Sequence, residues 1–215
     1  MTNKIRNINR RSFILGSSLA FSYVSKVLSN NIANKAHIVV LGAGWGGLSA
    51  AKTIRLLNKE CKITVIEKNK KFMSCPISNW VIGQIKEIDD ISFKYDNFVK
   101  NNNIDIIFDE VISINLSKKY VATSNTKLRY DKLVLSPGIQ LDFSSIEGFS
   151  NITDGSLFSA WKAGDETKFL AKKIEKIQNG DNIIITVPLS PYRCPPGPYE
   201  RASLIAAYIK KRKIN

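Results

Sequence analysis

Histidine and cysteine are both scarce in this sequence of 215 residues, which contains one histidine and three cysteines. With a single histidine, the chain cannot assemble a histidine-based general base or a histidine metal cluster by itself. His37 opens an expected strand, and we assign it a structural role. Any catalytic chemistry must therefore use other side chains or a cofactor.

Acidic residues are also few: the chain has 18 aspartates and glutamates against 32 lysines and arginines, which gives a net charge of +14. Basic clusters such as residues 210–213 are not accompanied by a nucleic-acid-binding motif, so we expect no nucleic-acid partner. We interpret these clusters as solvated surface, and a docking site for an acidic protein is the alternative.

The N-terminal 36 residues contain no acidic residue and no long apolar run. Arg10 and Arg11 precede a modestly apolar stretch, residues 13–28, which is too short and too polar for a comfortable membrane span. This pattern resembles a twin-arginine export signal, although a clean A-x-A cleavage motif is missing, and an uncleaved basic tail is the alternative. We expect residues 1–36 to direct export by the twin-arginine route to the periplasm, where disulfides persist.

One stretch contains every part of a dinucleotide-binding unit. The apolar run Ile38–Leu41 predicts a buried parallel strand, and residues 42–47, GAGWGG, fit the motif G-x-G-x-x-G. Residues 48–57 have the spacing of an amphipathic helix, and a second strand, residues 62–66, ends at Glu67.

Each part of this stretch has a task in binding a dinucleotide. Gly42 permits the tight turn, Gly44 lets a pyrophosphate approach the backbone, and Gly47 lets the helix pack on the sheet. The helix N-terminus presents N–H groups to the phosphates, and Glu67 can accept hydrogen bonds from an adenosine ribose. A glycine-rich turn that binds nothing is the alternative, and the motif does not separate FAD from NAD.

The rest of the chain predicts further strands and helices in alternation. We expect a helix near residues 93–100, strands over 104–108, 111–114 and 133–135, antiparallel arms over 119–122 and 127–129, a helix over 165–177, a strand over 182–187, and a helix over 199–212. The strand that ends at Leu135 leads into a Ser-Pro-Gly turn, where Gly138 allows the chain to pass close to a dinucleotide.

Two cysteines lie where a bound cofactor could be reached. Cys75 follows the second strand, on the ligand side of a dinucleotide fold, and a buried free thiol is the alternative. Cys194 precedes a helix N-terminus and is adjacent to Arg193; both features favour the thiolate, and a rigid turn with an inert cysteine is the alternative. The loop that contains Cys194, residues 190–201, has prolines, which offer no N–H to a phosphate. We therefore do not expect this loop to bind a nicotinamide dinucleotide. We expect Cys61 to cap a sheet edge and not to pair with Cys194.

Three segments carry a resemblance to one protein family: CPISNWVIG at residues 75–83, AWKAG at 160–164, and YRCPPGPYERAS at 192–203. Through them the chain, over residues 10–213, resembles the flavoprotein subunit of flavocytochrome c sulfide dehydrogenase. That subunit belongs to the FAD-dependent pyridine nucleotide-disulfide oxidoreductase superfamily.

The resemblance implies FAD as the cofactor, with Cys75 bonded covalently to the flavin 8α-methyl group. Cys194 matches one half of a redox disulfide, whose second cysteine lies beyond residue 215 in this family. Sulfide would attack the disulfide, and electrons would pass to FAD and then to a c-type cytochrome subunit. The residues matched to the cofactor site are Gly42, Gly44, Gly47, Glu67, Cys75, Val111, Pro137 and Gly138.

With the resemblance, the sequence predicts an α/β fold: a Rossmann-like FAD-binding domain with a small antiparallel β-meander, over residues 37–180, after an export signal at 1–36. Residues 181–215 are expected to be the first βα unit of an incomplete second dinucleotide-type domain. One strand cannot bury both of its faces, so we expect the N-terminal portion of a longer protein that needs its C-terminal half.

Two other functions remain open at this point. A sulfide:quinone oxidoreductase would use the same fold, although the sequence has no amphipathic anchor and such enzymes normally lack this kind of export signal. A truncated flavin-binding remnant without turnover is the non-enzymatic alternative.

Overall fold

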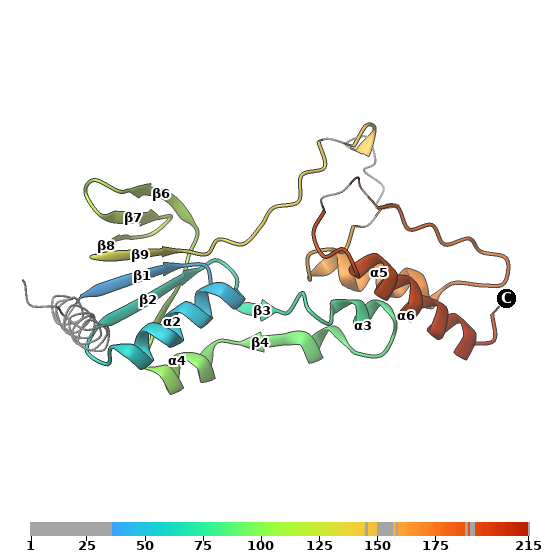
Figure 1. The fold of residues 1–215 in the computed structure, drawn as a ribbon, viewed down its shortest axis with the longest axis horizontal. Coiled ribbons are helices and arrows are strands. Elements are labelled where there is room, and N and C mark those ends of the chain that lie inside the picture. Colours follow the sequence, from blue (N-terminus) through green and yellow to red (C-terminus); the bar gives the residue numbers. More distant parts are fainter. Residues whose placement is uncertain are drawn as a thin grey trace, which may run out of the picture. The chain divides into compact units, whose positions relative to one another are not determined.

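The structure is a computed structural model, and it describes residues 36–144, 146–149, 157, 159–187, 189 and 192–214 (Figure 1). The predicted export signal lies outside the described residues except for Ala36. Contacts divide the described chain into two compact units. The first unit contains residues 36–68 and Phe98–Pro137, and the second contains Asn69–Asn97 and the described residues from Gly138 onward. The domain boundary placed after residue 180 stays a prediction.

The first unit is built on a four-stranded sheet in which all neighbouring strands are parallel and the order is β5-β2-β1-β9. Val39 of β1 is paired with Thr64 of β2 on one side and with Leu133 of β9 on the other. Four consecutive residues of β1 are buried, as the unbroken apolar run predicts for a central parallel strand. The strands are β1 (His37–Leu41), β2 (Lys62–Glu67), β5 (Asp105–Phe108) and β9 (Lys132–Leu135).

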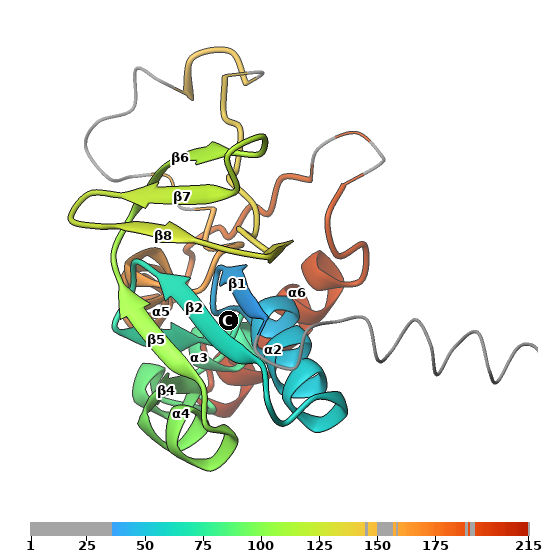
Figure 2. The same ribbon diagram turned by 90° about the vertical axis from the view of Figure 1, so that its left-hand side faces the viewer.

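Different elements cover the two faces of this parallel sheet. On one face lies α2 (Trp45–Leu57); on the other lies an antiparallel sheet of β6 (Val111–Asn115), β7 (Tyr120–Thr123) and β8 (Lys127–Arg129) (Figure 2). The core between the two sheets contains Val39, Leu41, Ile66, Val121 and Tyr130. The predicted Rossmann-like sheet and its β-meander are confirmed.

The second unit is mostly helical. Its elements are a two-stranded antiparallel ribbon of β3 (Lys71–Met73) and β4 (Ser92–Lys94), the helices α3 (Ser78–Ile82), α5 (Asp165–Glu175) and α6 (Gly197–Lys211), and the 3₁₀ helix η1 (Ile88–Ile91). Helix α3 contacts both α5 and α6. Ile82 of α3, Ile174 of α5 and Ile205 of α6 share one buried cluster, which joins the three helices.

The start of the helix predicted at residues 93–100 is wrong. Phe93 and Lys94 belong to β4, and the helix here, α4, spans Asp96–Asn102. Phe93 is paired with Phe72 of β3, and the two rings stack with centroids 6.4 Å apart. Cross-strand pairing therefore overrides the local helical spacing at this position.

The strand predicted over residues 182–187 is also wrong, because the structure has no strand pairing there. Ile184 is 83% exposed, although it lies in an apolar run. A strand exists only through hydrogen bonds to a neighbouring strand, and no strand in the described parts of the chain pairs with this segment. Of the βα unit expected at residues 181–215, the described residues form the helix, α6, but not the strand.

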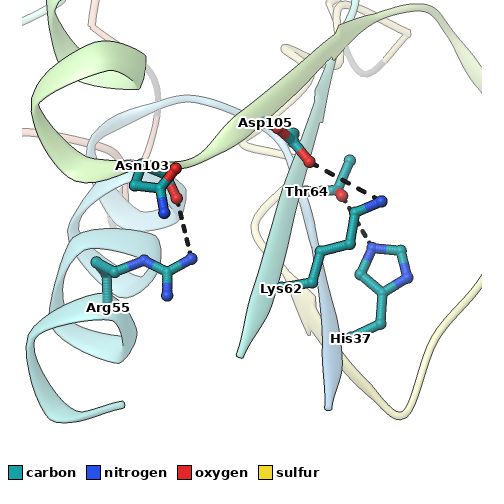
Figure 3. Close-up of polar contacts among 6 residues, drawn as sticks. All are labelled: His37, Arg55, Lys62, Thr64, Asn103 and Asp105. Atoms are coloured by element: carbon teal, nitrogen blue, oxygen red, sulfur yellow. Dashed lines mark hydrogen bonds and ion pairs between the residues drawn. The ribbon is translucent and has the colours of Figure 1, made fainter. Parts of the chain in front are cut away.

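His37 is held at the start of β1 by hydrogen bonds of its ring and its backbone. Its ring Nε2 lies 2.8 Å from the Thr64 hydroxyl (Figure 3). Its backbone N–H donates to the Asp131 carboxylate at 2.7 Å. The same end of the sheet carries the Lys62–Asp105 ion pair and the bond from Arg55 to the Asn103 carbonyl. Burial, followed by the charge of Lys62, lowers the pKa of His37 below its usual 6.5.

This lowered pKa predicts a small loss of stability on mild acidification. The unfolded chain binds more protons than the folded chain below about pH 6.5, so the contribution of His37 is present above that pH and is lost as the pH falls through the folded value. His37→Asn should show a smaller difference in unfolding free energy between pH 7.5 and 5.5 than the unmodified chain, measured by urea titration. The pKa of Asp109, lowered to about 2 mainly by its hydrogen bond with Thr123, lies far below this range. An equal pH dependence in both proteins would contradict the assignment.

Candidate functional site

The glycine turn between β1 and α2 can be formed only by glycine at two positions. Gly42 has a φ of +91°, and a Cβ at this residue would overlap the Ser136 carbonyl. A Cβ on Gly47 would overlap the Gly42 carbonyl and lie 3.4 Å from Val40 Cγ1. Both observations agree with the roles that the sequence gives these glycines: the tight turn at Gly42 and the close packing of helix on sheet at Gly47.

Gly44, in contrast, borders open space. It is the N-cap residue of α2, and a Cβ built on it would meet no atom within 4 Å. Among the described residues no side chain caps this helix, and its first turn contains no acid. A phosphate approaching Gly44 would therefore meet the positive end of α2, whose own first turn contains no carboxylate.

Glu67 lies directly at the glycine turn between β1 and α2, since the Ala43 N–H donates to the Glu67 carboxylate Oε2 at 2.9 Å. Pro137 is also adjacent, with its Cα 3.4 Å from where a Cβ on Gly42 would be. Val111 packs instead against the hydrophobic core of the first unit. The structure thus brings the three motif glycines, Glu67 and Pro137 together; the contact of each with a dinucleotide stays a prediction.

The other predicted site residues belong to the second unit, where Trp161 lies close to both candidate cysteines. The Cys75 thiol donates to the Trp161 carbonyl oxygen over 3.3 Å. On the ring side, a Cβ on Gly197 would lie 2.8 Å from Trp161 Cζ3 and 3.3 Å from Cys194 Sγ. Cys75 and Cys194 are therefore both close to one tryptophan. Gly138 is in the same unit, with a φ of +80° and open space around it.

All three cysteines are free thiols with different surroundings. Cys61 is 2% exposed in the first unit and donates to the Asn58 carbonyl over 3.3 Å, whereas Cys75 is half-buried and Cys194 is exposed. That Cys61 does not pair with Cys194 stays a prediction. Cys75 and Cys194 are the two thiols that a cofactor or a small molecule could reach.

Sequence reasoning missed Arg201 of α6, which is only 4% exposed. Its guanidinium donates to the carbonyl oxygens of Ser159 and Ala160, each at 2.8 Å, and to Asn79 Oδ1 at 3.0 Å. Its Cζ lies 3.7 Å from the centroid of the Trp161 ring. The available signal was its spacing, since Arg201 precedes the buried Ile205 by four residues and so falls on the apolar face of α6.

Arg201 keeps its charge at neutral pH despite this burial. Desolvation lowers its pKa to about 10, while the neighbouring Cys75 and Glu200 raise it. In the described part of the chain it forms no ion pair with a carboxylate, and its hydrogen-bond acceptors are neutral oxygens. A buried cation of this kind is stable only if its hydrogen bonds are made, and here they are.

Three non-glycine residues in the segments that contain the two candidate cysteines and Trp161 have left-handed backbone conformations. They are Ile77 (φ 67°), Ala160 (φ 47°) and Cys194 (φ 56°). For the β-branched Ile77 this conformation is a genuine outlier. Strain of this kind persists only where the surrounding contacts hold it, and it tends to gather at functional sites.

Comparison with known protein families gives a match that covers more than half of the chain: the model of the pyridine nucleotide-disulphide oxidoreductase family fits residues 36–183. The chain belongs to this family. A second model, described as sulfide dehydrogenase (flavocytochrome c) flavoprotein chain, central, matches residues 167–215, a range that includes Cys194 and Arg201.

Several known proteins are similar to part of this chain. Coenzyme A disulfide reductase of Staphylococcus aureus (strain MRSA252) is 35% identical over 127 residues, which are 54% of this chain and 28% of the reductase. The sulfide:quinone oxidoreductase of Aquifex aeolicus superposes with a TM-score of 0.67 and 26% identity, over 83% of this chain and 41% of that one. An NAD-dependent persulfide reductase from A. fulgidus gives a TM-score of 0.56 and 25% identity, over 66% and 28%. The chain spans less than half the length of each of these relatives.

Membership of the pyridine nucleotide-disulphide oxidoreductase family implies a flavin cofactor, and the glycine turn of the first unit fits a dinucleotide. The open space at Gly44, the uncapped start of α2 and the carboxylate of Glu67 are the three features that such a ligand requires. Among the described residues, no group of three or more His, Cys, Asp or Glu side chains could hold a metal ion. No helix in the same residues is both long and apolar enough to cross a bilayer.

Proposed function

We propose that this chain is the FAD-binding part of a flavin-dependent sulfide dehydrogenase that delivers electrons to a c-type cytochrome in the periplasm. The observation that carries the proposal is the placement of Cys75 and Cys194 around Trp161. The match of residues 167–215 to the flavoprotein chain of sulfide dehydrogenase supports the same assignment. The pattern at residues 1–36 supports export by the twin-arginine route.

Each predicted residue has a task in this proposal. Gly42, Gly44 and Gly47 would hold the pyrophosphate of FAD and Glu67 its ribose, with Val111, Pro137 and Gly138 completing the contact with the dinucleotide. Cys75 would bind the flavin covalently through a thioether at the 8α position. FAD, when bound, would supply the two-electron acceptor for electrons that leave the thiols.

Cys194 would carry the thiol chemistry, as one half of a redox disulfide. Hydrosulfide attacks the disulfide, so that a persulfide forms on one cysteine and the other leaves as a thiolate. We do not assign Cys61 as the second cysteine, because its thiol is buried and donates to the Asn58 carbonyl. The proposal therefore assigns that cysteine to a C-terminal half of the same enzyme.

A quinone acceptor is the second candidate. It is favoured by the similarity to the sulfide:quinone oxidoreductase of Aquifex aeolicus, which superposes with a TM-score of 0.67. The two candidates share the fold and the thiols, and they differ only in where the electrons go.

The acceptor is decided by a direct assay of the chain together with its C-terminal half. We expect sulfide to reduce c-type cytochrome but not ubiquinone in this mixture. Cys194→Ser should lower the rate by roughly a hundredfold or more, because a hydroxyl can neither form nor exchange a disulfide. Cys61→Ser is the matched control, since serine can still donate to the Asn58 carbonyl. Reduction of ubiquinone alone would select the second candidate, and reduction of neither acceptor would contradict sulfide oxidation.

A further inference from the structure

Arg201 is the one arginine among the described residues that combines near-complete burial with bonds to several separate segments of the second unit. One of its hydrogen bonds goes to Asn79 in α3, and two go to the carbonyls of residues 159 and 160. Its guanidinium also covers the ring of Trp161. Arg201 therefore ties α6 to two segments that are far apart in the sequence.

These two segments are the ones that fix Cys75. Asn79 lies four residues after Cys75, at the start of α3, and the Asn79 side chain also donates to Glu200 at 2.8 Å. On the opposite side, the Cys75 thiol donates to the carbonyl of Trp161, the residue next to the two that bind Arg201. Loss of Arg201 would therefore remove support from both sides of the Cys75 loop at once, although Asn79 would keep its bond to Glu200.

The backbone of both segments needs such support. Ile77 lies between Cys75 and Asn79, and Ala160 accepts a hydrogen bond from Arg201; both residues have positive φ values. Neither conformation is favoured for its residue type, so each persists because the surrounding contacts hold it. Four charge-assisted or ring contacts from one buried side chain supply much of that support.

We propose that Arg201 is a positioning residue that fixes the Cys75 thiol for attachment of the flavin. This proposal rests on the proposed function, in which Cys75 bonds covalently to FAD. Arg201 acts through the backbone of residues 77 and 159–161, and no contact between Arg201 and the cofactor is required.

The test compares Arg201→Met with Arg212→Met in the full chain. Arg212 is a matched control because it lies at the end of the same helix, donates to the carbonyls of Glu175 and Ile177, and lies over the ring of Tyr208, but it binds neither segment next to Cys75. The first measurement is the share of bound flavin that stays on the polypeptide after acid denaturation. We expect this share to fall roughly tenfold or more in Arg201→Met and to stay unchanged in Arg212→Met.

The second measurement needs no flavin. In the flavin-free chain, iodoacetamide labelling resolved by peptide mass spectrometry should modify Cys75 roughly tenfold faster in Arg201→Met, because the loop opens more often. Far-UV circular dichroism reports whether the second unit keeps its helices, because the buried Cys61 lies in the first unit and reports only on that unit. If the helical signal falls in Arg201→Met, the variant Asn79→Ala, which removes only one attachment, is used in its place, with an expected increase in Cys75 labelling of roughly threefold.

Two results would overturn the proposal. One is a folded Arg201→Met variant in which Cys75 is labelled at the same rate as in the unmodified chain. The other is the same unchanged rate in Asn79→Ala, where that variant is used instead. Arg201→Lys keeps the charge but not the forked geometry, and we expect only partial rescue. If the unmodified chain holds no acid-stable flavin, the covalent attachment fails, and the labelling rates alone then decide the positioning role.

Discussion

Cys75→Ala is expected to lose all of its flavin when the holoprotein is denatured in acid, whereas the unmodified chain should keep its yellow colour in the pellet. A thioether survives acid and unfolding, but hydrogen bonds to a folded glycine turn do not. Cys75 is half-buried and its thiol is fixed on the Trp161 carbonyl, so a defined sulfur is available in the unit that also contains Cys194. Absorbance of the pellet and the supernatant near 450 nm gives the measurement.

The control for this prediction is Cys61→Ser, which changes the one fully buried thiol. It should leave the flavin in the pellet, since Cys61 is in the first unit and bonds only locally to Asn58. If the unmodified chain released its flavin entirely to the supernatant, the covalent bond would be refuted while non-covalent binding by the glycine turn would stand.

Gly47→Ala is expected to destabilise the first unit by about 3 kcal/mol or more, whereas Gly44→Ala should cost about 1 kcal/mol or less. The added methyl group at position 47 would overlap the Gly42 carbonyl, a backbone atom that cannot move without breaking the turn. At position 44 the same methyl group enters open space. Urea unfolding of the two variants compares the free energies of unfolding directly.

Flavin affinity of the folded protein should show the opposite order, with the larger effect in Gly44→Ala and the smaller in Gly47→Ala. Gly44→Ala places its methyl group where we propose the pyrophosphate lies, so affinity should fall roughly tenfold or more, measured by fluorescence titration in the Cys75→Ala background. Unchanged affinity in Gly44→Ala would contradict that position for the pyrophosphate. Equal destabilisation by both substitutions would contradict the packing difference.

The dinucleotide-binding unit could be predicted because its signals are local. A continuous apolar run in β1, a glycine motif, helical spacing in α2 and a terminal glutamate lie within about thirty consecutive residues, and each has a single physical interpretation. The structure adds the contacts behind them: the Ala43 N–H on Glu67 and the Ser136 carbonyl against Gly42. The roles of Cys75 and Cys194, by contrast, came from resemblance.

Long-range pairing accounts for the errors in the predicted elements. Phe93 has helical neighbours in the sequence, but pairing with Phe72 across an antiparallel ribbon places it in a strand. Residues 182–187 have the composition of a strand, but the described residues offer no strand to pair with them. Local spacing cannot detect either the presence or the absence of a hydrogen-bonding neighbour.

The sequence by itself determined the α/β fold and the glycine turn with its acidic partner, because backbone freedom at glycine and apolar periodicity are properties of single residues or short segments. Only the tertiary structure decided that Cys75 and Cys194 both lie at Trp161 and that Arg201 is buried among the carbonyls beside them. These relations join residues up to 126 positions apart, from Cys75 to Arg201, and only the packing of α3, α5 and α6 brings them together.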